Sequence, residues 1–267
     1  VSADSPTPPA APPPPRDGAG AARGGGMESR LYGDLRRGWR VTMPNLEQVG
    51  LLVVRYLDVA QIAADQELWQ QHAPRLAGLD PAVRRHLIEV LLDEFRRELA
   101  IDVGCLTADG FEGVQRRSRQ HLRSPWSLAE DEEVVSVGTV HPHPHRGPQN
   151  RGRDHLYVGP QGAYGRYLRA TAHLKDLSRE ELGECIESLF ALLTTVGSLV
   201  EVGERAYRLK ASSVIWERGD GKRGADDPLR RRFDSEDGAR VNPFFRDLYR
   251  GVATDLAGLH AAEHTAQ

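Results

Sequence analysis

A strongly amphipathic segment over residues 81–100 limits the possible folds of this chain more than any other stretch. Asp80 precedes it as an N-cap, and Pro81 takes the first helical position, where a missing N–H costs nothing. Large apolar side chains then recur every four residues, at Val83, Leu87, Leu91, Phe95 and Leu99, with Ile88 and Leu92 beside them. A face this wide must bury against other elements, so we predict a helix that packs on a hydrophobic core.

Further periodic segments predict a helix-rich α+β fold. We expect additional helices over residues 58–71, 108–122, 162–174, 178–197 and 242–259, and a short buried strand over 51–54. Ser178 and Glu181 have the spacing of a capping box, which marks the start of the fourth of these helices. Alternating residues on either side of Gly203-Glu204 predict a β-hairpin that ends at Lys210.

The first 27 residues differ from the rest of the chain because they are mostly Pro, Ala and Gly. Such a segment has too little apolar surface to offset its conformational entropy, so we expect a disordered tail, with Met27 as a possible translation start. The organisation expected after this tail is a mixed, mainly helical domain (28–140), a linker (141–161), a winged-helix-like unit (162–216), a loop (217–241), and a C-terminal helix with a truncated lobe segment (242–267).

Composition excludes several classes of protein. The 267 residues are 39% hydrophobic, but the apolar runs are far shorter than the roughly 20 residues that span a bilayer. We therefore expect no membrane association. The two cysteines, Cys105 and Cys185, lie far apart and have no partner motif, which excludes a disulfide framework and a zinc module. A reducing, cytoplasmic location is expected.

Charge is unevenly distributed along the chain although the net charge is only −3. Residues 141–175 hold six basic residues and one acidic residue, and residues 205–223 hold six basic and two acidic residues. The segment between them, 176–204, has one basic and seven acidic residues. Two interpretations follow: the basic segments form a local patch for an anionic ligand, or the segments are complementary surfaces of one domain.

The sequence has none of the common catalytic motifs. Gly221-Lys222 is followed by Arg223 and lacks the earlier glycine of a phosphate-binding loop, and neither Gly-x-Ser-x-Gly nor His-Glu-x-x-His occurs. His141, His143 and His145 alternate with prolines, which favour an extended conformation that does not direct three imidazoles to one ion. We therefore predict a solvated linker there, no metal site, no catalytic residue, and no cofactor bound by this chain.

The two helices and the hairpin between residues 154 and 216 resemble a winged helix, although a complete winged helix usually has three helices. In such a unit the basic side chains contact phosphates and supply most of the affinity. The candidate residues are Arg166, Arg169, Arg205, Arg208 and Lys210. Strand alternation directs Tyr207 and Leu209 inward and Arg208 and Lys210 toward water. The alternative is an ordinary solvated hairpin.

Three stretches resemble a known family: LYGDLRRGWRV (31–41) with PNLEQ (44–48), YRLKASSVIW (207–216), and VNPFFRDLYR (241–250) with AEHTAQ (262–267). Residues 28–267 resemble an internal segment of large bacterial superfamily-two DNA helicases of the DISARM phage-defence type. In that family the segment is an insertion in the second RecA-like lobe. Its end resembles the turn before the fifth helicase motif, which singles out Glu263, His264, Thr265 and Gln267.

The resemblance implies a fragment or subunit of an ATP-dependent DNA helicase that binds nucleic acid without ATPase motifs. ATP and Mg²⁺ are expected only in the complete helicase, and the expected partners are DNA, the remaining helicase chain and other defence-system subunits. Tyr207 and Trp216 are candidates for stacking on a base, but core packing is the favoured role for both. The alternatives are a protein-interaction scaffold and a non-functional remnant of a split helicase gene.

Overall fold

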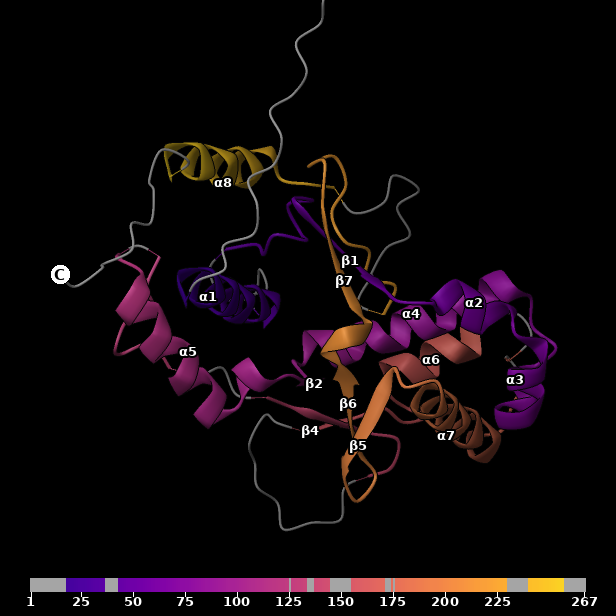
Figure 1. The fold of residues 1–267 in the computed structure, drawn as a ribbon. Helices are drawn as coiled ribbons and strands as arrows, with labels where there is room; N and C mark the ends of the chain where they lie inside the picture. The colour runs from indigo at the N-terminus through magenta and orange to yellow at the C-terminus, as the bar shows by residue number, and fades with distance from the viewer. Residues whose placement is uncertain are drawn as a thin grey trace, which may run out of the picture.

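The structure is a computed structural model that describes residues 18–36, 43–124, 126–133, 137–144, 155–170, 174, 176–229 and 240–256. It is a helix-rich α+β protein, as the sequence predicts (Figure 1). Its helices are α1 (Gly18–Arg36), α2 (Val59–Ala64), α3 (Gln66–His72), α4 (Pro81–Arg97), α5 (Ala108–His121), α6 (Ala163–Ala170), α7 (Arg179–Thr195) and α8 (Pro243–Leu256), with short 3₁₀ turns at η1 (Pro74–Leu76), η2 (Gly104–Leu106) and η4 (Ala211–Ser213). Its strands are β1 (Leu52–Tyr56), β2 (Ile101–Asp102), β3 (Thr139–His141), β4 (His155–Tyr157), β5 (Leu199–Gly203), β6 (Ala206–Lys210) and β7 (Val214–Arg218).

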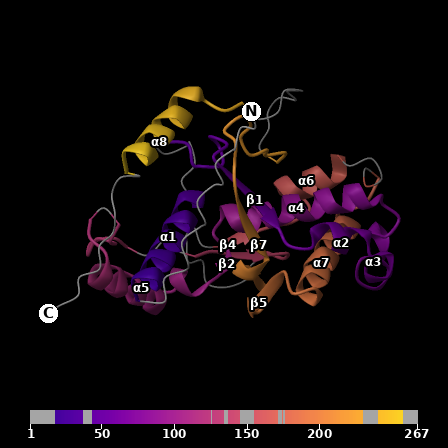
Figure 2. The ribbon, with the colours of Figure 1, turned by 45° about the horizontal axis from the view of Figure 1, so that its top comes forward.

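Helix α4 lies at the centre of the fold. Its apolar stripe is buried, with Leu87, Ile88 and Leu91 fully enclosed, and each such side chain contributes roughly 1.5–3 kcal/mol. Phe95 meets Phe190 of α7 with ring centroids 5.5 Å apart. Figures 1 and 2 show α1, α5 and α8 on one side of the strands and α2, α3, α6 and α7 on the other. One connected cluster of buried apolar residues joins α1 and α5 to α2, α3, α6 and α7, and α8 contributes no described residue to it.

Two sheets connect segments that are distant in the sequence. β1 pairs antiparallel with β7, and Val54 lies opposite Trp216. In the second sheet β6 has β5 along one edge, and it has the parallel β2 and the antiparallel β3 along the other; β4 pairs parallel with β3. β6 is therefore an internal strand.

Capping signals in the sequence are confirmed at the starts of α4, α7 and α8, whereas Asp58 before α2 makes no side-chain capping bond. The Asp80 carboxylate accepts a hydrogen bond from the Ala82 N–H at 2.8 Å at the start of α4. The capping box at α7 is complete, with the Ser178 side chain and the Glu181 side chain each bonded to the other residue's backbone. The side chain of Asn242 accepts from the Phe244 N–H at 3.0 Å at the start of α8.

The predicted boundary of the N-terminal tail is wrong. Residues 18–27 belong to α1 rather than to a disordered tail over 1–27, and residues 1–17 lie outside the described part of the chain. The small residues that indicate disorder here permit close helix packing: a Cβ added at Gly25 would lie 3.3 Å from the Val114 side chain of α5, and Ala22 is 1% exposed. Tyr32 and Leu35 bury the remainder of this face.

Two other predicted boundaries also differ. The helix expected over 58–71 is interrupted at Asp65, which ends α2 and whose side chain caps α3 by accepting from the Leu68 N–H. The linker expected over 141–161 contains strand residues at both ends, because β3 ends at His141 and β4 begins at His155. Val140 and Val158 belong to the common core, so this segment does not separate two hydrophobic cores.

Among the described residues, none of the helices is both long enough and apolar enough to span a bilayer.

Candidate nucleic-acid interface

The β5–β6 hairpin forms where predicted, but its turn is Glu204-Arg205 rather than Gly203-Glu204. Arg205 has a left-handed backbone with φ of 53°, and its N–H donates to the Glu201 carboxylate at 2.9 Å. This local bond stabilises a backbone conformation that is unfavourable for any residue with a Cβ. The turn therefore fixes where the arginine leaves the hairpin.

The inward side of the hairpin matches the predicted alternation. Leu209 is fully buried, and the Tyr207 ring packs edge-on against Phe190 at 5.2 Å between centroids. Burial raises the pKa of Tyr207 above its ordinary value, with a further contribution from the charge of Glu201. Trp216 packs edge-on against Tyr32 at 5.4 Å. Core packing, the favoured role for both aromatic residues, is confirmed.

The basic side chains on the outward side of the hairpin are less exposed than predicted. Arg208 and Lys210 are half-buried rather than solvated, because β6 has neighbours on both edges. The Nε of Arg208 donates to the Gly138 carbonyl at 3.2 Å. The two side chains thus lie within a sheet, and the hairpin does not project alone as the predicted wing requires.

The two arginines predicted on the preceding helix are exposed. Arg166 and Arg169 lie three residues apart on α6, so they share a face of that helix. Arg166 donates to the Gln161 carbonyl at 2.9 Å. The opposite face of α6 anchors the helix, because Leu168 is fully buried and the Tyr164 hydroxyl donates to the Leu87 carbonyl at 3.0 Å.

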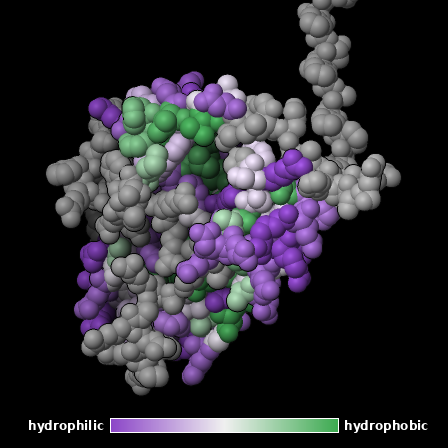
Figure 3. All heavy atoms as spheres, turned by 90° about the vertical axis from the view of Figure 1, so that its left-hand side faces the viewer, coloured by the Kyte–Doolittle hydropathy of each residue, from purple (hydrophilic) through white to green (hydrophobic). Residues whose placement is uncertain are grey.

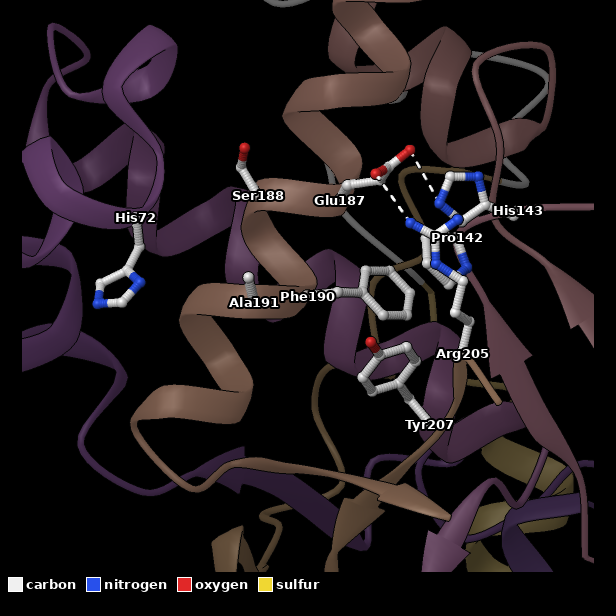
Figure 4. Close-up of a pocket in the computed structure, with 9 residues that line it drawn as sticks. All are labelled: His72, Pro142, His143, Glu187, Ser188, Phe190, Ala191, Arg205 and Tyr207. Atoms are coloured by element: carbon white, nitrogen blue, oxygen red, sulfur yellow. Dashed lines mark ion pairs between the residues drawn. The ribbon is translucent and has the colours of Figure 1, made fainter. Parts of the chain in front are cut away.

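A groove of about 320 Å³ crosses α7 beside the hairpin turn. Glu187 of α7 lies between the imidazole of His143 and the guanidinium of Arg205, with one carboxylate oxygen 2.9 Å from His143 Nε2 and the other 3.6 Å from Arg205 Nη2 (Figure 4). The groove is lined by His72, Pro142, His143, Glu187, Ser188, Phe190, Ala191, Arg205 and Tyr207. A ligand in this groove meets an aromatic wall and a polar rim.

Glu187 changes the electrostatics expected at the hairpin. Its carboxylate offsets the charge of Arg205, so a phosphate that contacts Arg205 must compete with Glu187. Sequence reasoning did not single out Glu187, His143 or His72 as groove residues. The sequence signal for this contact is the change from a net negative charge over residues 176–204 to a net positive charge over residues 205–223. The Arg205–Glu187 ion pair joins these two segments, as expected if they form complementary surfaces of one domain.

Within the described ranges, His, Cys, Asp and Glu side chains form no group of three able to hold a metal ion. Cys105 and Cys185 are buried and unpaired by disulfides. The four residues singled out by the helicase resemblance, Glu263, His264, Thr265 and Gln267, lie outside the described residues.

Comparison with protein-family models, curated proteins and solved structures found no match to this chain.

Proposed function

We propose that this chain is a nucleic-acid-binding segment of a DNA helicase, located in the cytoplasm, that works beside chains or domains supplying the ATPase. The resemblance of residues 28–267 to such a segment supports the proposal, as does the absence of a phosphate-binding loop from the sequence. The observation that carries it is the exposure of Arg166, Arg169 and Arg205 on α6 and the hairpin turn.

These arginines suit contact with phosphates in different ways. The Arg205 side chain is 57% exposed and its contact with Glu187 is long, so a phosphate can replace the carboxylate at little cost. Arg166 is bonded to a carbonyl, which carries no net charge and leaves the guanidinium charge in place. Sequence-independent binding through such contacts weakens as salt rises, because phosphates release their counterions.

A double variant, Arg166→Ala with Arg169→Ala, tests the proposal. Binding to a 30-base-pair duplex, measured by fluorescence anisotropy across salt concentrations, should weaken, and the slope of log affinity against log salt should fall by about 0.9 for each lost contact. The matched control is Arg116→Ala with Arg117→Ala on α5, which removes the same charge from two exposed residues elsewhere. Equal effects of the two double variants would contradict a specific role for α6.

A protein-interaction scaffold is the second candidate, and helix α8 favours it. Phe244, Leu248 and Val252 follow one another at four-residue spacing and are 68%, 40% and 49% exposed. Figure 3 shows hydrophobic side chains gathered at the top of the molecule, where α8 lies. Exposed apolar stripes of this kind are typical of interaction surfaces. Duplex binding that is absent even at low salt would favour the scaffold over the nucleic-acid segment.

A further inference from the structure

The Glu187 carboxylate on α7 joins two segments that are far apart in the sequence, the residues after β3 and the turn of the β5–β6 hairpin. One oxygen lies 2.9 Å from His143 Nε2 and the other 3.6 Å from Arg205 Nη2 (Figure 4). His143 Nε2 is shielded from solvent, whereas the Arg205 side chain is 57% exposed. One carboxylate is therefore shared between an enclosed imidazole nitrogen and a guanidinium that solvent and ligands can reach.

The ionisable groups around this pair have their own contacts. Glu184, one turn before Glu187 on α7, pairs with Arg75 at 3.2 Å. The Glu201 carboxylate accepts from the Arg205 backbone N–H, and Figure 4 shows His72 across the groove from Glu187. The ionisable side chains on the elements around His143, besides Glu187 and Arg205, are His72 of α3, His141 of β3, Glu184 of α7, and Glu201 and Tyr207 of the hairpin.

Protonation of His143 changes the charge of this group by one unit. With a neutral imidazole, the charges of Glu187 and Arg205 sum to zero, and with an imidazolium the three side chains sum to +1. Histidine is the side chain that ordinarily gains a proton between about pH 8 and pH 5. The argument does not depend on the total charge of the surface, because it compares the same surface with and without one proton.

We propose that His143 and Glu187 make phosphate binding by Arg205 dependent on pH, with tighter binding in acid. The inference rests on the proposed function, because the ligand is the phosphodiester backbone. When His143 is neutral, Glu187 has Arg205 as its cation and competes with the phosphate for it. When His143 is protonated, Glu187 has a second cation at the shorter distance, and Arg205 becomes available to the phosphate. By linkage, duplex binding favours uptake of a proton by the same group.

The test compares duplex affinities of the full chain at two pH values. Anisotropy titrations with the same duplex use about 0.05 M salt, at about pH 5.5 and about pH 7.5, because salt screens surface charges. A unit charge roughly 8 Å from a phosphate changes its affinity about two- to threefold. The ratio of the two affinities should therefore be larger by this factor in the unmutated chain than in His143→Gln.

Three further variants locate the effect. His72→Gln is the matched control, because it removes a histidine from the same groove and leaves the Glu187 contacts in place, so the ratio should not change. Glu187→Gln should bind the duplex more tightly at the higher pH, because the competing carboxylate is gone. Arg205→Gln should lose the part of the pH response that depends on His143. Circular dichroism and urea midpoints at both pH values establish that folding is intact.

The outcomes separate this inference from the proposed function. Duplex binding with the same ratio in the unmutated chain and in His143→Gln overturns the inference alone. An equal reduction of the ratio in His72→Gln, or a response to His143 that persists in Arg205→Gln, also overturns it. Calorimetry in two buffers of different ionisation enthalpy tests the unmutated chain directly, and binding without proton uptake overturns the inference as well. Absence of duplex binding at both pH values contradicts the inference and the proposed function together.

Discussion

The buried cation Arg96 provides a quantitative test of how this fold is held together. Its side chain is 3% exposed, and its guanidinium forms an ion pair with Glu47, donates to Asp93 at 2.8 Å and donates to the Tyr56 hydroxyl at 3.1 Å. Burial lowers the pKa of Arg96, but Tyr56, Glu47 and Asp93 together raise it well above its ordinary value, so the group stays charged. It thereby joins segment 43–50 and β1 to the central helix.

We expect Arg96→Met to reduce the free energy of unfolding by about 3–5 kcal/mol, because it leaves the Glu47 carboxylate buried without its cation. Urea denaturation followed by circular dichroism measures the loss. The double variant Arg96→Met with Glu47→Gln should recover part of it, since no buried charge then lacks a partner at that contact.

Arg85→Met is the matched control on the same helix. Arg85 pairs with Glu89 at 2.8 Å, but the side chains are 48% and 35% exposed, and such helical pairs contribute about 0.3–0.5 kcal/mol. A loss below about 1 kcal/mol for Arg96→Met, or one equal to that of Arg85→Met, would refute the view that the buried network stabilises the fold.

The remaining predictions concern α7, the hairpin and ATP. Hydrogen bonds from Ser178 and from Arg75 lower the pKa of Glu181 below its ordinary 4.5 in the folded chain, so this group stabilises α7 at higher pH and the contribution is lost as pH falls through the lowered value. Glu181→Gln should therefore flatten the acid side of the profile of urea midpoint against pH, and an unaltered profile would count against the capping box. Arg208→Ala with Lys210→Ala should leave the salt slope for duplex binding unchanged, because both side chains are half-buried within the sheet, whereas a slope shallower by about 0.9 per contact with intact folding would add this strand to the interface. The purified chain should not hydrolyse ATP with or without DNA, and DNA-stimulated phosphate release would disprove this.

Much of the helical structure could be predicted because its signals are local. Asp80, Pro81 and the apolar stripe of α4 specify a start and a buried face within one segment, and Ser178 with Glu181 does the same for α7. Apart from its β5–β6 hairpin, the second sheet could not be predicted in this way. Its strands β2, β3 and β4 have only two or three residues each, and their pairing depends on contacts between distant segments.

Composition misled the prediction at the N-terminus for a physical reason. Ala and Gly lack the apolar surface that identifies a core helix, yet they allow two helices to approach closely, as at Gly25 beside Val114. The charged contacts of the interface could likewise be predicted only in part. The acidic residues of segment 176–204 indicated that Arg205 has a carboxylate partner, but they did not indicate that this partner is Glu187.

The salt dependence of duplex binding tests the central claim, that this chain binds nucleic acid through phosphate contacts, most directly. Anisotropy titrations of a labelled 30-base-pair duplex with the purified chain should give an affinity that falls linearly with salt on logarithmic axes. A slope of about −1.8 or steeper corresponds to at least two phosphate contacts. Binding of unrelated duplex sequences should agree within a small factor, because phosphates carry no sequence information. Absence of binding at low salt, or an affinity independent of salt, would contradict the claim.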